Sequence, residues 1–158
     1  SDYSADMTLS NGADLSFSNA TTSLIDIADG ETHQARDLSF TTVTMTATAT
    51  LAARDVIYLD GTASQADKAD ASGVATGYAI GISAEAISAD AAGRVYTQQG
   101  AVISGFSGLT AGGTYYLSET AAAITTTAPT AAGTVVYIVG FALSTTELIF
   151  SPQFILEN

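Results

Sequence analysis

The sequence lacks several residues on which common protein chemistries depend. It has no cysteine and no tryptophan, and His33 is its single histidine. Without cysteine the chain cannot form disulfides, zinc sites built from thiolates, or a thiol nucleophile, although this absence leaves its cellular compartment open. A length of 158 residues is nevertheless sufficient for one domain whose hydrophobic core needs no covalent support.

Basic residues are scarce as well. Four lysines and arginines stand against sixteen acidic residues, and the formal net charge is −12. Such a surface repels the phosphates of nucleic acids and of anionic membranes, so we expect neither as a partner. We also expect no signal peptide and no membrane anchor, because no apolar run has the required length. Only 13% of the residues are charged, which suits a protein that packs against other proteins.

Alternation of apolar and polar residues predicts β-strands along most of the chain. The stretch TTVTMTATATL, residues 41–51, places Val, Met, Ala and Leu on one face and threonine on the other. This threonine face is a candidate interface with a partner, and it consists of Thr42, Thr44, Thr46, Thr48 and Thr50. Further strands are expected at 56–59, 78–83, 94–98, 101–106, 114–118, 134–143 and 147–156.

Short strands separated by Gly, Asp, Ser and Pro indicate an all-β fold. We expect a single β-sandwich or barrel-like domain, jelly-roll-like, over residues 38–158. The stretches ASQADKADA (63–71) and ETAAA (119–123) are rich in helix formers but short, so at most a helical turn is expected in each. Residues 1–37 have apolar pieces between turn signals, and two interpretations stay open: an extended N-terminal arm that lies on another protein, or the first strands of the same domain.

An internal repeat relates residues 56–83 to residues 114–144. Tyr58-Leu59 recurs as Tyr116-Leu117, and the segment that begins at Tyr78 recurs at Tyr137. Two copies indicate a duplicated half-sandwich or two strand pairs related by a pseudo-twofold axis. Gly81 and Gly140 occupy equivalent places within predicted strands, where glycine usually marks a bulge or a close approach of two backbones.

Candidate catalytic groups are few and scattered. His33 lies in a polar turn beside Glu31 and Arg36, and no GxSxG sequence supplies a serine for a catalytic triad. Glycoside hydrolysis requires two neighbouring carboxylates, but the glutamates are spread along the chain at positions 31, 85, 119, 147 and 157. We therefore expect no catalysis.

Metal and cofactor sites are not indicated either. The loop 60–73 contains Asp60, Asp67 and Asp70 without the spacing of a calcium loop, and a solvated hairpin loop accounts for it. The glycine-rich stretch from Gly105 to Ser118 fits neither a P-loop nor a dinucleotide loop. We interpret it as a corner at Ser107-Gly108 and a turn at 111–113, so that Gly108, Gly112 and Gly113 have structural roles.

The second copy of the repeat carries a recognisable pattern. The sequences GFSGLTAGGTYYLSETAAAITTTAP (105–129) and TVVYIVGFALSTTELIFSP (134–152) combine G-L-T-x-G-x-T-Y-Y-L-S, T-T-T-A-P and V-G-x-A-L-S. This pattern resembles virion structural proteins of tailed bacteriophages, which include capsid decoration or cement proteins, head fibres and the ends of tail fibres. The likeness covers about residues 55–152.

The resemblance implies a protein without enzymatic activity that binds the major capsid protein on the outer capsid surface of a virion. As a cement protein it is expected to form a homotrimer, to stabilise the shell, and to use residues 1–37 as an arm that reaches a neighbouring subunit. The alternative is a head- or tail-fibre module that binds a receptor or glycan through exposed tyrosines and the loop 60–73. A fibre normally carries a shaft as well, for which 158 residues leave little room.

Overall fold

The computed structural model describes residues 42–62 and 64–158. They belong to the second of the two units into which the chain divides, residues 38–158. The arm and His33 belong to residues 1–37, which lie outside the described residues, so the expectations for them stay predictions. The described part of the chain contains ten strands and no helix, which confirms the all-β class.

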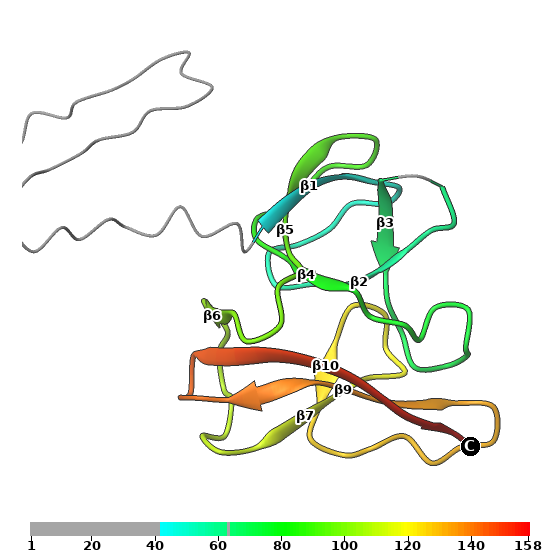
Figure 1. The fold of residues 1–158 in the computed structure, drawn as a ribbon, viewed down its shortest axis with the longest axis vertical. Coiled ribbons are helices and arrows are strands. Elements are labelled where there is room, and N and C mark those ends of the chain that lie inside the picture. Colours follow the sequence, from blue (N-terminus) through cyan, green and yellow to red (C-terminus); the bar gives the residue numbers. More distant parts are fainter. Residues whose placement is uncertain (1–41, 63) are drawn as a thin grey trace, which may run out of the picture. The chain divides into compact units, whose positions relative to one another are not determined.

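The first five strands form a closed barrel in the order β1-β3-β2-β4-β5. They are β1 (Thr42–Ala47), β2 (Val56–Leu59), β3 (Gln65–Lys68), β4 (Gly81–Ser83) and β5 (Ala92–Tyr96) (Figure 1). The pairing of β1 with β3 is parallel and closes the ring, and the other pairings are antiparallel.

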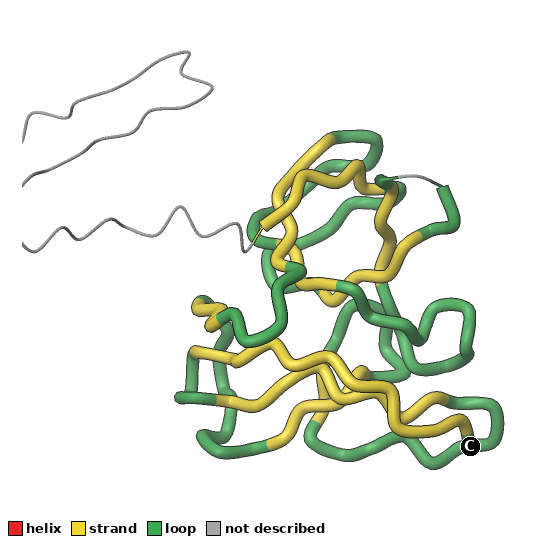
Figure 2. The backbone as a smooth tube through the Cα atoms, in the orientation of Figure 1, coloured by secondary structure: helices red, strands yellow, loops and turns green. Residues whose placement is uncertain are grey.

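The last five strands form a sheet in the order β6-β10-β9-β7-β8. They are β6 (Val102–Ser104), β7 (Thr114–Leu117), β8 (Ile124–Thr125), β9 (Val135–Ala142) and β10 (Glu147–Glu157). Figure 2 shows the strands of the barrel around a ring, and the longer strands of the sheet side by side in one layer. We call the two groups of strands the first half and the second half.

The two halves have the same strand order and the same register. Each strand of the first half corresponds to the strand five places later in the chain, β1 to β6 and so on to β5 and β10. Around the closed barrel the order can also be read as β1-β5-β4-β2-β3, which corresponds to β6-β10-β9-β7-β8, except that β8 does not pair with β6. One row of directly opposed residues crosses the first half at Val56, Ile82, Tyr96 and Thr42. The equivalent row crosses the second half at Thr114, Phe141, Ile149 and Val102. The chain is thus a tandem pair of one five-stranded module, and the sequence repeat spans its three middle strands.

Backbone details repeat as well. Arg54 and Gly112, at equivalent positions, both have a φ of 77°. Arg54 donates its backbone N–H to Ser83, the last residue of β4, and Gly112 donates its own to Ala142, the last residue of the equivalent strand β9. Ser64 and Ala122 form a second equivalent pair, with φ values of 60° and 66°. Left-handed backbone is uncommon outside glycine, so its recurrence at Ser64 and Ala122 supports the duplication independently of the sheet order.

The second half does not close, because its chain turns away from the closing position. In the first half, the N–H of Thr46 donates to the carbonyl of Ser64 between β1 and β3. The equivalent N–H, of Phe106, donates instead to Thr146, and the carbonyl of Ala122 accepts from Val56 of the first half. The divergence begins at Gly105, whose φ of 92° is incompatible with a continuing strand.

Two hydrophobic cores result. The barrel interior holds the smaller one: Met45, Ala47, Leu51, Ile57, Ala66, Ile87 and Val95. The larger core lies between the outside of the barrel and the inner face of the open sheet. Its fully buried sheet residues include Ile103, Leu117, Val139, Leu148 and Phe150, and the first half contributes Val56, Ala69, Ala71, Ala79 and Ile82. The first half therefore fills the space that closure of the second would have enclosed.

Several expectations about the elements differ from the structure. The strands are divided between a closed barrel and an open sheet, whereas one jelly-roll-like sandwich or barrel was expected. The stretch 63–71 contains the strand β3 where at most a helical turn was expected, because β3 pairs with both β1 and β2 and buries Ala66 between them. The strand β1 ends at Ala47, before Leu51, and Val43 near its start is 44% exposed although the alternation predicted burial.

Candidate interaction surfaces

The threonine face lies on the outside of the barrel, but only part of it is one strand face. Thr42, Thr44 and Thr46 belong to β1, where Thr44 is exposed and the other two are half-buried. Thr48 follows the strand and donates its hydroxyl to the carbonyl of Ala66 at 3.3 Å, and Thr50 is exposed in the next loop. The structure thus offers three threonines, not five, as one surface.

A charged pair borders this threonine surface. Arg94 of β5 lies opposite Thr44 and forms an ion pair with Glu85 at 3.2 Å. Hydrogen bonds from the Arg94 side chain, and then from its backbone N–H, lower the pKa of Glu85. Glu85, one of the scattered glutamates considered for catalysis, is therefore held as a carboxylate by a guanidinium.

The remaining glutamates have separate environments. Glu119 follows β7, Glu147 accepts a hydrogen bond from the Ser144 hydroxyl at 3.0 Å, and Glu157 is exposed at the end of β10. Glu31 lies outside the described residues.

The loop between β3 and β4 is held in shape by one of its acidic side chains. The Asp70 carboxylate accepts hydrogen bonds from the Ser72 N–H at 2.9 Å and from the Thr76 hydroxyl at 3.1 Å. Burial, and then the negative charges of Asp60, Asp67 and Asp70, raise the pKa of Tyr58. Across residues 42–62 and 64–158, no cluster of three His, Asp or Glu side chains could hold a metal ion.

Gly81 and Gly140 lie where neighbouring backbones come very close. A Cβ atom at Gly81 would collide with the carbonyl oxygen of Tyr96, and one at Gly140 with that of Ile149, the equivalent residue. The register between β7 and β9 also shifts directly before Gly140, since Tyr115 lies opposite Gly140 but Tyr116 lies opposite Ile138. Both positions therefore admit no side chain without a shift of the backbone.

The glycines of the corner have a different basis. Gly108 and Gly112 have φ values of 70° and 77°, in the left-handed region that favours glycine. Gly113 has no such φ, but a Cβ there would lie 2.8 Å from the carbonyl oxygen of Thr110, which already accepts the Gly113 N–H in a turn. The segment joins β6 to β7.

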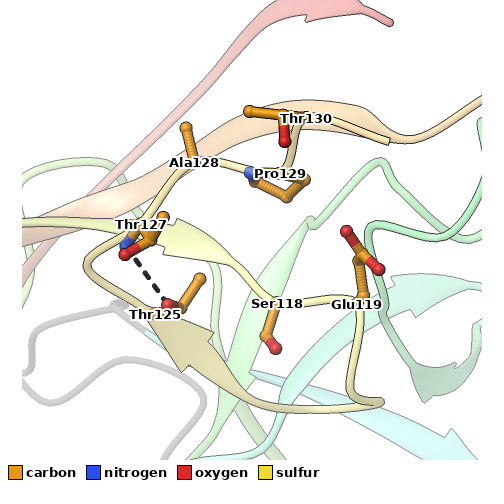
Figure 3. Close-up of a pocket in the computed structure, with 7 residues that line it drawn as sticks. All are labelled: Ser118, Glu119, Thr125, Thr127, Ala128, Pro129 and Thr130. Atoms are coloured by element: carbon orange, nitrogen blue, oxygen red, sulfur yellow. Dashed lines mark hydrogen bonds between the residues drawn. The ribbon is translucent and has the colours of Figure 1, made fainter. Parts of the chain in front are cut away.

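A polar pocket of about 280 Å³ opens beside the β7–β8 loop. Its lining residues are Ser118, Glu119, Thr125, Thr127, Ala128, Pro129 and Thr130 (Figure 3). Asn158 holds the segment between β8 and β9 that also lines the pocket, because its amide donates to the carbonyl of Pro129 at 3.0 Å. Hydroxyl groups and one carboxylate in a concave surface can hydrogen-bond a small polar ligand, and the volume is at the lower end for ligand sites.

Apolar side chains are exposed on the side of the open sheet that faces away from the core. Val102, Ile149 and Phe141 lie next to one another across β6, β10 and β9. Val102 is 52% exposed and Phe141 is 40% exposed, and Leu143, just beyond β9, is 53% exposed. We call Val102, Thr114, Phe141, Leu143 and Ile149 the outer face of the open sheet. Adjacent exposed apolar residues on one sheet are typical of protein interfaces.

Sequence reasoning missed this surface, although a signal was present. The strand β9 reads VVYIVGFA, which has no polar residue at any position. A strand with one solvated face alternates between apolar and polar residues, whereas a continuous apolar run is typical of a strand covered on both faces. The run therefore predicts cover on both faces, and Phe141 is the one residue of β9 that the structure leaves exposed.

Comparison with known proteins gives no match. No protein-family model, no curated protein and no solved structure is similar to this chain. Within residues 42–62 and 64–158, no helix is long and apolar enough to cross a bilayer.

Proposed function

We propose that this chain is a capsid decoration, or cement, protein of a tailed bacteriophage. It binds the major capsid protein on the outer surface of the shell, as a homotrimer, and stabilises the shell by binding alone, without catalysis. Residues 1–37 reach a neighbouring subunit.

One observation carries the proposal. The residues that resemble phage virion proteins, 105–129 and 134–152, build β7, β8, β9 and most of β10. These strands form most of the open sheet, whose outer face exposes Phe141 and its apolar neighbours. The part of the chain that carries the resemblance is thus also the part with a surface suited to contact with protein.

The composition fits this mode of action. A surface with few charges can be buried against another protein without leaving charges unpaired, which would cost several kcal/mol each. A trimer that contacts several shell subunits at once also gains affinity by multivalency, since the second and third contacts form within one complex. Binding to the assembled shell in preference to its dissociated subunits then stabilises the shell by mass action.

Shells with and without the chain test the proposal. We expect hundreds of copies on each particle, and a lower temperature of disruption, or greater sensitivity to osmotic shock, for shells that lack the chain. Adding the purified chain back should restore the stability. Equal stability with and without the chain would contradict the proposal.

A fibre module that binds a receptor or glycan is the second candidate, and the pocket beside the β7–β8 loop favours it. Several hydroxyl groups and the Glu119 carboxylate line this pocket and can bind the hydroxyls of a sugar. For this candidate we expect few copies on each particle and measurable binding of host glycans. Glu119→Ala should weaken that binding, whereas Glu157→Ala, at an exposed position outside the pocket, should not. Absence of glycan binding by the wild-type chain would exclude this candidate.

A further inference from the structure

The duplicated module shows what one of its surfaces is built to contact. In the first half, the row Val56, Ile82 and Tyr96 lies on the outside of the barrel. Val56 and Ile82 are fully buried there, and Tyr96 is partly buried, because the inner face of the second half covers them. In this chain, therefore, this row of the module is covered by another copy of the module.

The equivalent row in the second half has no such cover among the described residues. Phe141 takes the place of Ile82, Ile149 that of Tyr96 and Thr114 that of Val56, and Val102 extends the row. Phe141 is 40% exposed where Ile82 is fully buried. The row has remained apolar at its centre although it is exposed to solvent.

We infer that the outer face of the open sheet binds the outer faces of other copies of this chain, about a rotation axis. Self-association is one element of the proposed function, and this inference rests on that element alone, because it needs no shell as a partner. Sheets commonly pack face to face through such apolar rows, and a rotation axis brings the same face of each copy into contact.

Charge also favours this face over other surfaces for contact between copies. Each copy has a net charge of −12, so the copies repel one another, and the repulsion is weakest for contacts that bring no like charges close together. The central residues of the outer face, Val102, Phe141 and Ile149, are apolar. Glu147, at the end of this face, already accepts the hydroxyl of Ser144 at 3.0 Å. The arm at residues 1–37 is the other occupant that the sequence offers, and the experiment separates the two.

Phe154 provides a matched control for Phe141. Both phenylalanines belong to the β9–β10 pair, and both are 40% exposed. Phe154, however, lies opposite the buried Tyr137 and stacks on Tyr78 with ring centroids 5.4 Å apart, so it belongs to the inner side of the sheet. A lysine at either position adds the same charge, but only the lysine at position 141 lies on the outer face.

The test is the oligomeric state of the purified full-length chain, measured by sedimentation over a range of concentrations. We expect the wild type and Phe154→Lys to associate, and Phe141→Lys to raise the dissociation constant about 30-fold or more, as loss of a central interface residue does. Circular dichroism checks folding, and Phe141→Thr, which keeps a strand-forming residue, serves if the lysine variant unfolds.

Cross-linking then locates the contact. The chain has no cysteine, so Phe141→Cys introduces a single thiol into the full-length protein. We expect this variant to form disulfide-linked dimers under mild oxidation, and Phe154→Cys to form few. A monomeric wild type, the result expected if the arm at residues 1–37 of the same copy covered the outer face, would overturn the inference. An oligomer that Phe141→Lys leaves intact, or that cross-links equally at both positions, would also overturn it.

Discussion

Arg54 joins the two halves of the molecule, and its removal should have a large and specific cost. Its guanidinium donates from Nε to the carbonyl of Ser104 in β6, and from Nη1 to the carbonyls of Ala84, at 2.7 Å, and Ser83, at 3.3 Å. It also lies 5.8 Å from the centre of the Tyr96 ring. Gly105 makes room for it, since a Cβ there would come within 2.9 Å of Nη2.

The structure gives the size of each effect. Arg54→Ala removes hydrogen bonds from a charged donor to three carbonyls, so the free energy of unfolding should fall by about 2 to 3 kcal/mol. Gly105→Ala places a side chain at a φ of 92°, which costs about 1 to 2 kcal/mol, and it also displaces the guanidinium. Because both changes remove the same hydrogen bonds, their costs should overlap by about 1 kcal/mol or more in the double variant.

Unfolding in denaturant measures this double-mutant cycle. Gly100→Ala is the matched control, because Gly100 has a similar φ of 86° but no atom within 4 Å of the position of a Cβ. The loss of stability in Gly100→Ala should therefore come from backbone strain alone, and this loss and that of Arg54→Ala should be additive within about 0.5 kcal/mol. The reasoning is refuted if Arg54→Ala and Gly105→Ala are also additive, since the two residues would then not share an interaction.

Other predictions concern the second half and its contact with the first. Gly140→Ala forces a Cβ against the carbonyl of Ile149 and should destabilise the protein by about 1 to 3 kcal/mol, whereas Gly73→Ala, in open space, should change stability by less than about 0.5 kcal/mol in the same denaturant assay. Tyr137→Phe leaves the carbonyl of Ala79, which now accepts the Tyr137 hydroxyl at 2.8 Å, without its partner, and should cost about 1 to 2 kcal/mol. Burial, and then a neighbouring tyrosine, raise the pKa of Tyr137 above its usual 10.0, so the unfolded state loses this proton first. The free energy of unfolding should therefore fall as pH rises above 10.0, and less steeply for Tyr137→Phe; identical slopes would refute this assignment.

The sequence predicts strands well where the side chains alternate or form long apolar runs. The strand β2 lies at its expected residues, β9 is shorter than expected by one residue at each end, and β10 is longer by one residue at its C-terminal end. The strand β3 was missed because its sequence, QADK, has one small apolar residue, and its position depends on pairing with β1 and β2. Long-range pairing of this kind leaves no local pattern to read.

That the strands of the second half form an open sheet, and not a closed barrel, could not have been predicted from sequence alone. Gly105 and its equivalent, Met45, differ in residue type, but only the structure shows that φ becomes positive at Gly105 and diverts the chain from the closing strand. Likewise, the exposure of Phe141 follows from which face of the sheet the first half covers. The apolar run in β9 indicates that a second face needs cover, but not which residues lie on it.

An image of the intact virion that carries this chain tests the proposed function most directly. Single-particle electron microscopy would show where density for a barrel joined to an open five-stranded sheet is found. We predict that it lies over the outer surface of the shell, in hundreds of copies grouped about rotation axes, with the outer faces of the open sheets toward those axes. Density confined to a vertex or to the tail, or absent from the particle, would contradict the account.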